Sequence, residues 1–547
     1  MPGSDGASFD YGAARAAFEL EVPEEFNFAF DVLSKRAREA DKLALIAVDK
    51  TGEKVERLSY ADLDEASSRF ANVLLGLGAA KGDYAFVMIP RLPAWYHVLF
   101  GCMKSGVVAM PGTNLLTAKD IEYRVNRSEA KLAIVTAEHA EKVEAVHDAC
   151  PSLEHLIIVG EERAGWTCLE TASAAAAAEV DRAALPPTRA DDPMLIYFTS
   201  GTTSMPKMVA RDHAYGLAHS ITGRYWLDLA EDDVHWTLSD TGWAKAAWGM
   251  FFPQFIAGVT MLIYDAEGFD AEAHLRLIER FRVTTFCAPP TVYRIFAQMD
   301  LSGFDLSSLR HSVGAGEPLN PEAMRAWKAA TGLEVHDGYG QTESINLVAN
   351  YPGMEIRPGS MGKPVPGLVI DIVDDDGNVL EDDAVGHIAV KLTEPWPLGL
   401  FHGYMGDDAA TAKSFHDGWY FTGDTATRDA DGYIWFVGRD DDIISSAGYR
   451  ISPFEVESAL VEHEAVAESA VVGKPDELRG EIVKAFVTLA PGFEPSDALT
   501  QEIQDFVKGH TAPYKYPREI VYREALPKTI SGKIRRVELR AEAAEEG

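Results

Sequence analysis

The 547-residue chain is poor in cysteine and in basic residues, and each shortage excludes a class of protein. Its four cysteines include no C-x-x-C pair, which excludes a disulfide framework and a cysteine-based zinc site. Fifty lysines and arginines stand against 85 aspartates and glutamates, so the net charge is −35. This charge opposes binding to nucleic acid and to anionic membrane surfaces. An anionic substrate therefore needs a site that builds its own positive potential.

Long apolar runs and the usual targeting signals are also missing. No run of 18 apolar residues occurs, so no membrane span is expected. Residues 1–26 lack the basic start and apolar stretch of a secretory signal. With reduced thiols as the default, these features predict a cytoplasmic protein. The common phosphate-binding loop is absent as well, because no Gly-Lys pair precedes Ser or Thr; the pairs are Gly362-Lys363, Gly473-Lys474 and Gly532-Lys533.

What the chain does contain is an alternation of apolar runs with helical patterns. Residues 84–89, 132–135 and 194–198 are short apolar runs that end in turns, as buried strands do. Residues 62–77 and 271–281 carry apolar side chains at helical spacing. This layout predicts an α/β fold whose strands are largely parallel.

The pattern changes twice towards the C-terminus. Residues 369–390 are short strand-like stretches with acidic turns, which indicates a small β-rich subdomain. Ser452, Pro453 and Glu455 form an N-cap, a first-turn proline and a capping-box acid, opening a helix to about His463. We therefore expect a first domain, a hinge and a small second domain, at residues 1–438, 439–442 and 443–547.

The segment YFTSGTTSMPKMV, residues 197–209, is the first with clear chemistry. It follows a strand-like run and offers hydroxyls and backbone N–H groups that can surround phosphate oxygens. A lysine six positions after the glycine adds a point charge. A polar surface loop is the alternative interpretation. The residues concerned are Thr199, Ser200, Gly201, Thr202, Thr203, Ser204 and Lys207.

Three further segments carry candidate ligands. In DGYGQTE (residues 337–343) the glycines permit close approach, Tyr339 offers a stacking face, and Thr342 and Glu343 are suited to phosphate and Mg²⁺; a structural turn is the alternative. In WYFTGD, Asp424 can accept hydrogen bonds from both ribose hydroxyls. The last candidate segment is a basic stretch at residues 528–536. The alternative interpretation of this stretch is a run of solvated surface charges.

Together these motifs identify a resemblance to a known superfamily. TSGTTSMPK, GAGEPLNPE, DGYGQTE, WYFTGD, GRDDDII-x-x-x-GYRI-x-PFEVE and PKTISGK occur in the order and approximate spacing of the adenylate-forming acyl-CoA synthetases. The resemblance spans roughly residues 28–536, and GYRISPFEVESAL and TAPYKYPR are most similar to the medium-chain subgroup. It implies a large N-terminal domain of α/β subdomains plus a β-rich subdomain, and a small mobile α+β C-terminal domain.

The resemblance also implies roles for single residues during adenylation. The loop at 199–207 would hold the β- and γ-phosphates of ATP, and Glu343 would bind Mg²⁺. Asp424 and Arg439 resemble the ribose ligands. Lys533 matches the lysine that bridges the acyl carboxylate and the nucleotide, and is expected to be catalytic together with Thr199, Glu343 and Arg450. The adenine and α-phosphate region would be lined by Gly316, Glu317, Pro318, Asp337, Gly338, Tyr339, Gly340, Gln341 and Thr342.

For the second step, attack of the CoA thiol on the acyl-adenylate, the resemblance implies a rotation of the small domain about a hinge at Asp441. Rotation would remove Lys533 and bring in a glycine-containing stretch along which pantetheine passes. Its residues are Ala447, Gly448 and Tyr449, with cations for CoA or the thioester centre at Arg450, Arg479, Lys515 and Arg518. For Arg479 and Arg518 an ordinary surface position is the alternative.

The acyl pocket is expected to contain two indoles, which favour a short, branched or aromatic acid. Core packing is the alternative for each tryptophan, and an outward orientation is the alternative for the lysine. The predicted pocket residues are Trp243, Lys245, Trp248, Cys287, Gly314 and Gly340.

The predicted reaction thus joins a carboxylic acid to CoA with ATP and Mg²⁺, without nucleic acid or membrane as a partner; a homodimer stays open. A stand-alone adenylation enzyme that loads a carrier protein is the first alternative. Amino-acid-activating relatives place an aspartate four residues before a tryptophan, and Ala244 stands there, ahead of Trp248. A luciferase-like enzyme, which would oxidise the adenylate, is an alternative that no feature of the sequence supports. Intact Lys207, Glu343 and Lys533 argue against a catalytically dead nucleotide sensor.

Overall fold

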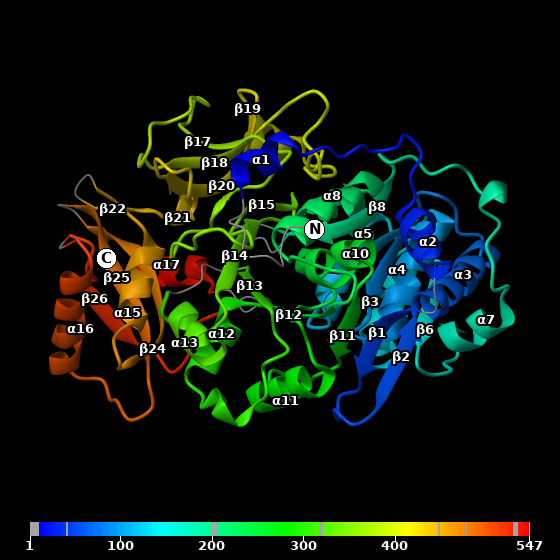
Figure 1. The fold of residues 1–547 in the computed structure, drawn as a ribbon, viewed down its shortest axis with the longest axis horizontal. Helices are drawn as coiled ribbons and strands as arrows, with labels where there is room; N and C mark the ends of the chain where they lie inside the picture. Colours follow the sequence, from blue (N-terminus) through cyan, green and yellow to red (C-terminus); the bar gives the residue numbers. More distant parts are fainter. Residues whose placement is uncertain are drawn as a thin grey trace.

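The computed structural model describes residues 10–39, 42–199, 205–316, 321–446, 449–476, 479–512, 514–528 and 534–545. Within these ranges the chain forms four sheets (Figure 1). Blue to green elements from the N-terminal part fill the right and centre of the view, and orange to red elements from the C-terminal part lie at the left. No helix in the described ranges is long and apolar enough to cross a membrane.

The first sheet has seven strands in the order β7-β6-β5-β3-β4-β8-β9, all parallel except for β9. Its strands are β3 (Tyr84–Met88), β4 (Val108–Pro111), β5 (Leu132–Thr136), β6 (His155–Val159), β7 (Thr167–Cys168), β8 (Pro193–Phe198) and β9 (Met208–Asp212). The helices between and after them are α4 (Pro93–Ser105), α5 (Ala118–Ser128), α6 (Ala137–Glu144), α7 (Leu169–Ala175) and α8 (His213–Tyr225).

The second sheet has nine strands in the order β16-β15-β14-β13-β12-β10-β11-β1-β2, with a parallel centre and antiparallel edges. Its strands are β1 (Leu43–Val48), β2 (Val55–Ser59), β10 (Val234–Thr237), β11 (Thr260–Tyr264), β12 (Thr285–Ala288), β13 (His311–Ala315), β14 (Val335–Gly340), β15 (Asn346–Ala349) and β16 (Lys363–Pro364). The helices of this part are α3 (Tyr60–Gly76), α9 (Ala244–Ala246), η4 (Ala247–Phe251), α10 (Phe252–Ala257), α11 (Ala271–Phe281), α12 (Pro290–Ala297) and α13 (Pro321–Thr331).

Two smaller sheets follow, and antiparallel pairing predominates in both. The third sheet contains β17 (Ile370–Val373), β18 (Gly386–Lys391), β19 (Phe415–His416), β20 (Trp419–Arg428) and β21 (Ile434–Arg439), beside α14 (Asp408–Ser414). The fourth contains β22 (Ile444–Ser446), β23 (Tyr449–Ile451), β24 (Val466–Asp476), β25 (Gly480–Leu489) and β26 (Glu519–Tyr522), with α15 (Pro453–Val461), α16 (Asp497–His510) and α17 (Arg536–Glu545). Buried residues between positions 444 and 543 form two hydrophobic clusters of their own.

Short helical segments connect these parts. They are α1 (Tyr11–Ala16), η1 (Ala29–Leu33), α2 (Ser34–Ala37), η2 (His147–Ala149), η3 (Arg182–Ala184), η5 (Leu301–Gly303) and η6 (Asp440–Asp442).

The observed elements follow the sequence patterns closely. The apolar runs at 84–89, 132–135 and 194–198 are strands, as predicted. Helix α3 begins two residues before the predicted segment because Ser59 and Asp62 form a capping box. Helix α15 has the predicted Ser452 cap and ends at Val461, slightly before the expected His463.

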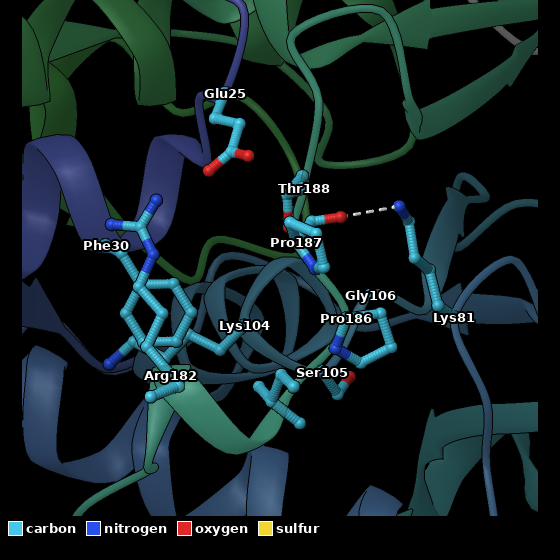
Figure 2. A pocket seen from close by; sticks show the side chains of 12 residues that line it. Glu25, Phe30, Lys81, Lys104, Ser105, Gly106, Arg182, Pro186, Pro187 and Thr188 are labelled. Atoms are coloured by element: carbon cyan, nitrogen blue, oxygen red, sulfur yellow. Dashed lines mark hydrogen bonds between the residues drawn. The ribbon is translucent and has the colours of Figure 1, made fainter.

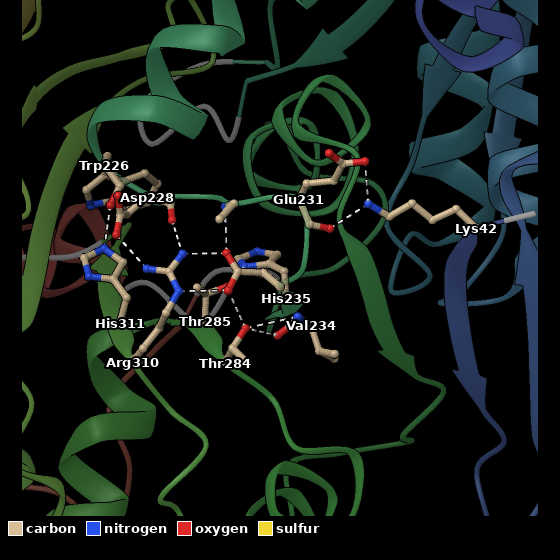
Figure 3. A network of polar contacts seen from close by, with 12 residues as sticks. Lys42, Trp226, Asp228, Glu231, Val234, His235, Thr284, Thr285, Arg310 and His311 are labelled. Carbon is tan, nitrogen blue, oxygen red and sulfur yellow. Dashed lines mark hydrogen bonds and ion pairs between the residues drawn. The ribbon is translucent and has the colours of Figure 1, made fainter. Parts of the chain in front are cut away.

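Polar contacts hold the amino ends of the parallel strands in the second sheet together (Figure 3). Arg310, just before β13, binds Asp233, just before β10, with its Nε 2.8 Å from Oδ1. Its Nη1 also lies 2.6 Å from Asp228. Burial alone would raise the pKa of Asp233, but hydrogen bonds from Arg310 and Thr284 contribute to a lowered pKa. The network is structural, because the carboxyl ends of these strands point the other way.

The carboxyl ends of the first and second sheets meet at the turn after β10. Thr241 donates to the carbonyl of Ile89 after β3 at 2.6 Å, and Thr113 after β4 donates to Asp240 at 3.0 Å. A Cβ added at Gly242 would lie 1.9 Å from the backbone nitrogen of Thr113 and 2.1 Å from the carbonyl carbon of Gly112. Only glycine allows the two backbones to approach this closely.

We therefore predict that Gly242→Ala destabilises the protein by about 3 kcal/mol, because backbone atoms have to move to admit the methyl group. Differential scanning calorimetry measures the loss. Gly76→Ala is the matched control: nothing lies within 4 Å of its added Cβ, so its stability should stay equal or rise slightly. Equal melting temperatures for the two variants would contradict the prediction.

Candidate functional site

Three of the predicted acyl-pocket residues lie on adjacent parallel strands. Cys287 is on β12, Gly314 on β13 and Gly340 at the end of β14. Cys287 pairs in register with Val313, and Gly314 with Asp337. Ligands bind outside the carboxyl ends of strands in open α/β sheets, so this edge is where a site is expected.

The predicted phosphate loop is a connection between the antiparallel strands β8 and β9. Thr199 and Lys207 close it: the Thr199 N–H donates to the Lys207 carbonyl at 3.0 Å, and the Lys207 N–H donates to the Thr199 hydroxyl at 3.1 Å. Strand pairing thus fixes both ends of the loop. The other predicted members, Ser200, Gly201, Thr202, Thr203 and Ser204, lie outside the described residues.

A tyrosine links this loop to the predicted metal ligand. The ammonium group of Lys207 lies 4.5 Å from the ring centroid of Tyr404, and the Tyr404 hydroxyl donates to Glu343 at 2.8 Å. Glu343 is 9% exposed. Burial raises the pKa of its carboxyl group, and the Tyr404 hydrogen bond and the charges of Arg211 and Arg439 oppose the rise. One phenol therefore holds a cation over its ring and a carboxylate at its hydroxyl group.

The predicted ribose ligand Asp424 is the centre of a second polar group. It is 5% exposed and lies on β20, where its Cα is paired with that of Arg439 on β21. Its Oδ2 accepts from the Tyr339 hydroxyl at 2.5 Å and from the Gln341 amide at 2.6 Å. Nε of Arg439 is 3.5 Å from Oδ1. The structure thus brings together four predicted nucleotide ligands, two from the end of β14 and two from the strand pair β20–β21.

The remaining predicted nucleotide residues are placed individually. Asp337 is buried on β14, and its Oδ1 accepts from the N–H of Gly338 at 2.9 Å. A Cβ at Gly338 would meet the Trp226 ring at 2.5 Å, so packing requires this glycine. Gly316 follows β13 with φ +107°, and Thr342 lies just before Glu343. Glu317 and Pro318 are outside the described residues, as is the predicted catalytic Lys533.

The two predicted indoles occupy different environments. Trp248 is 5% exposed in η4, and its Cη2 lies 2.4 Å from where a Cβ on Gly340 would stand. Trp243 precedes α9 and is half-buried. Lys245 does not point outward, the alternative considered for it, because its ammonium group donates to the carbonyl of Ala315 at 2.9 Å. Its charge opposes the rise that burial causes in the pKa of Cys287.

Two of the predicted CoA-binding residues, Tyr449 and Lys515, lie beside the same tyrosine, Tyr514. Tyr449 is 51% exposed and stacks on Tyr514, with ring centroids 4.1 Å apart. Lys515 follows Tyr514, and its ammonium group is paired with the Glu455 carboxylate at 2.6 Å.

The other predicted CoA-binding residues lie apart from Tyr449 and Lys515. Arg479 is exposed at the turn before β25. Arg518, just before β26, donates to the Tyr516 hydroxyl at 3.1 Å. Arg450 is on β23, opposite Ser445. Ala447 and Gly448 lie outside the described residues, and of the predicted hinge residue Asp441 the structure gives only its place in η6.

Sequence reasoning missed two residues that position Glu343. Tyr404 comes 61 residues later in the chain, and an isolated bridge between Val209 and Tyr404 holds it beside β9. Arg211 is 2% exposed, and its Nη1 donates to the Glu343 carbonyl at 2.9 Å. Its side chain also donates to the carbonyl of Gly399. The available signal was an arginine directly after the apolar residues 208–210.

A surface cavity elsewhere is no competitor for this site. It is lined by Lys81, Lys104, Arg182 and neighbours (Figure 2). Each of these cations is neutralised: Lys81 pairs with Asp192, Lys104 with Asp64 and Arg182 with Asp31. The cavity therefore lacks free positive charge for an anionic ligand.

Comparison with known proteins decides what this arrangement is. The family model of AMP-binding enzymes matches residues 33–405, and that of the AMP-binding enzyme C-terminal domain matches residues 455–533. The chain belongs to the AMP-binding enzyme family. The mouse protein named acyl-coenzyme A synthetase ACSM3, mitochondrial, is 44% identical over 542 residues, or 97% of this chain and 93% of the relative.

Solved structures of the family agree. The anthranilate CoA ligase AuaEII in complex with anthranoyl-AMP matches with TM-score 0.87 and 32% identity, over 96% of this chain and 98% of the ligase. A benzoate CoA ligase from Burkholderia xenovorans LB400 matches with TM-score 0.81 and 30% identity, over 94% and 100%. They confirm the predicted fold class. The chain is an AMP-forming acyl-CoA synthetase, an acid-thiol ligase whose substrates are a carboxylic acid, ATP and CoA.

One prediction is wrong. A cytoplasmic location conflicts with the mouse, rat and human relatives, whose names place them in mitochondria. The features used for it, scattered cysteines and the lack of a secretory signal, speak only against an oxidising, secretory environment. They do not distinguish between compartments in which thiols stay reduced.

Proposed function

We propose that the acid is short- to medium-chain, branched or aromatic. The observation that carries this proposal is the indole of Trp248, buried against Gly340 at the strand edge where the acyl pocket is expected. A bulky ring at that position limits the depth available to an acyl chain. The two solved relatives named for anthranilate and benzoate act on aromatic acids, which a compact pocket admits.

We infer the nucleotide roles from the two polar groups around Glu343 and Asp424. Asp424, held by Tyr339 and Gln341, keeps Oδ1 directed to the side of Arg439 and can accept from ribose. Lys207, fixed by strand pairing and by Tyr404, supplies the cation for the phosphates. The loop at 199–207 would surround the β- and γ-phosphates with N–H and hydroxyl groups.

Mg²⁺ fits this proposal. Glu343 is a single buried carboxylate, and the described residues contain no cluster of three metal-ligating side chains. Mg²⁺ commonly binds through one or two carboxylates and takes its other oxygens from substrate phosphates and water. Glu343 would hold the ion, which supplies positive charge for the phosphates.

For the chemistry, the acyl carboxylate oxygen attacks the α-phosphorus and pyrophosphate leaves, giving the acyl-adenylate. Two anions have to approach one another in this step, so a cation between them lowers the barrier. We assign that role to Lys533 on the strength of the PKTISGK motif. The CoA thiol then attacks the acyl carbon and AMP leaves. For this step we propose a role for the strand pair β22–β23, which contains Arg450.

The test is a screen of purified protein with ATP, CoA and acids of two to sixteen carbons, including branched and benzoic acids. Release of both AMP and pyrophosphate should depend on the acid and peak at about three to eight carbons or at a compact ring. A maximum at twelve to sixteen carbons would contradict the proposed acid class. Pyrophosphate release that does not require CoA and yields no acyl-CoA thioester would favour the carrier-loading alternative.

The proposed boundaries, residues 1–438 and 443–547 about the hinge at 439–442, have their own test. Asp441→Pro fixes φ in the middle of η6 and should hinder rotation of the second domain. Adenylation should survive, and CoA-dependent turnover should fall at least about tenfold; single-turnover assays separate the two. Asp441→Ala is the control, since it removes the carboxylate but keeps backbone freedom. A parallel loss of both rates in the proline variant would show that the hinge lies elsewhere.

A further inference from the structure

Buried polar atoms without hydrogen-bond partners gather beside the indole of Trp248. In the described part of the chain sixteen buried side-chain polar atoms lack a partner, and five of them belong to neighbouring residues here. These residues, which we call the α8 polar cluster, are Arg211, Tyr215, His219, Trp248 and Asn346. The atoms are Nε of Arg211, the Tyr215 hydroxyl, Nε2 of His219, Nε1 of Trp248 and Nδ2 of Asn346.

Ring contacts connect the members of the α8 polar cluster. Tyr215 and His219, one turn apart on α8, have ring centroids 4.5 Å apart, and His219 lies 6.3 Å from Trp248. The guanidinium of Arg211 stacks on Tyr215 at 3.8 Å. Burial raises the pKa of Tyr215 to about 12, and Arg211 and the Trp248 N–H act against that rise. The side chains are 0–5% exposed, so bulk water does not satisfy them.

The hydrogen bonds on the other side of His219 fix its tautomer. Thr222 donates its one hydroxyl hydrogen to Oδ1 of Asn346 at 2.7 Å. The same hydroxyl therefore accepts from Nδ1 of His219, 2.9 Å away, and Nδ1 carries the proton. Burial lowers the pKa of His219 well below its usual value, so the ring is neutral at physiological pH. Nε2 of His219 is consequently an acceptor.

The α8 polar cluster thus contains a hydrogen-bond donor and a hydrogen-bond acceptor close to one another. The Trp248 N–H faces the Tyr215 hydroxyl oxygen. The hydroxyl hydrogen of Tyr215 can still be donated, and His219 can accept. Each buried polar atom left unpaired is unfavourable, and native interiors rarely leave several together. A hydroxyl group satisfies both kinds, because it accepts and donates. A carboxylate has no proton for Nε2, and an ammonium group would be buried beside the Arg211 guanidinium.

Trp248 connects this cluster to the expected acyl pocket. One edge of the indole lies against Gly340 at the end of β14, and the ring also neighbours His219 on α8. We propose that the α8 polar cluster is the far end of the acyl pocket and selects acids that carry an uncharged hydroxyl group remote from the carboxylate. This inference rests on the acid class proposed above and narrows it.

The experiment compares matched acids over a range of lengths. Straight-chain acids of four to eight carbons are tested as pairs that differ only in a terminal hydroxyl replacing a methyl group, together with the ω-amino and dicarboxylic analogues. At the best length, kcat/KM for the hydroxy acid should exceed that of the methyl isostere by at least about tenfold, because the isostere leaves the buried groups unpaired. The amino and dicarboxylic acids should fall below both.

Variants show whether the cluster is the source of the preference. Tyr215→Phe removes only a hydroxyl and should reduce the hydroxyl-to-methyl ratio about tenfold. Tyr60→Phe is the matched control: Tyr60 is equally buried, and its hydroxyl donates to the carbonyl of Val259 outside the cluster. It should keep the wild-type ratio. A thermal melt of each variant checks that both fold.

The outcomes separate this inference from the proposed acid class. Turnover with no hydroxyl preference, or the same ratio in wild type and Tyr215→Phe, overturns the inference and leaves the ligase intact. A stronger response to the dicarboxylic acid overturns the choice of an uncharged group. If no acid of this series releases AMP, the proposed acid class fails. Calorimetric titration with the same pairs then decides the inference: tenfold tighter binding of the hydroxy acid supports it, and equal binding overturns it.

Discussion

Lys533→Ala should slow acyl-adenylate formation by a factor of about 10² to 10³ and leave thioester formation from a supplied acyl-adenylate close to the wild-type rate. The lysine is needed where the carboxylate meets the α-phosphate, and in the proposed cycle the small domain carries it away before CoA arrives. Pyrophosphate release measures the first step, and thioester formation from synthetic acyl-adenylate measures the second.

A second lysine of the same basic segment provides the control. Lys528 lies five residues earlier and pairs with Glu468 at 2.8 Å, so Lys528→Ala removes an equal charge without touching the proposed reaction. Both half-reactions should stay near wild type in that variant. Equal losses of the two steps in Lys533→Ala would disprove the assignment of this residue to the first step alone.

Trp248→Gly should move the preferred acid to longer chains by two or three carbons. Each additional buried CH₂ contributes about 0.8 kcal/mol, so kcat/KM for the longer acids should rise by roughly one to two orders of magnitude relative to the short ones. The variant should also be less stable, because removing a buried indole costs about 3–5 kcal/mol. Acid-length profiles and melting temperatures test both statements.

Ligand-induced stabilisation gives this prediction an independent readout. An acid of ten to twelve carbons that fills the vacated space should raise the melting temperature of Trp248→Gly more than that of wild type. Trp248→Phe opens less room and should show an intermediate profile. An unchanged profile in the glycine variant would mean that the indole belongs to the core and that residues near Cys287 set the length.

Local patterns in the sequence were sufficient for most of the architecture. The strands are short apolar runs because both faces of a largely parallel sheet are covered, and this pattern is readable without knowledge of the fold. The same is true of helix starts such as Ser452, whose side-chain cap is encoded within four residues. Helix ends are less determined, and α15 stops at Val461 rather than at His463.

The predicted ligands come together in the structure where the end of β14 in the second sheet contacts β20 in the third sheet. Asp424, in the middle of β20, meets Tyr339 and Gln341 at the end of β14, and each motif was recognisable alone. Their roles with ATP stay predictions. Ser200–Ser204 and Lys533 lie outside the described residues, and their positions stay predictions too.

Contacts that depend on distant segments could not be predicted. Tyr404 reaches Glu343 through a bridge to β9, and nothing in its neighbourhood of the sequence marks it. Tyr215 and His219 are one turn apart on α8, which shows that they share a face but not that Trp248 and Asn346 cover it. Lys245 turns inward because the end of β13 offers the Ala315 carbonyl, which is a tertiary property.

The close approach of Gly242 to Thr113 restricts how this enzyme can be recombined with others. Residues 112–113 and 240–243 pack closely against one another, although 127 positions separate Thr113 from Asp240 in the sequence. A chimera that takes one segment from a relative and keeps the other has to match two backbones within van der Waals contact. Crossover points should therefore fall outside both segments, or both should be exchanged together, wherever the donor carries a side chain in place of Gly242.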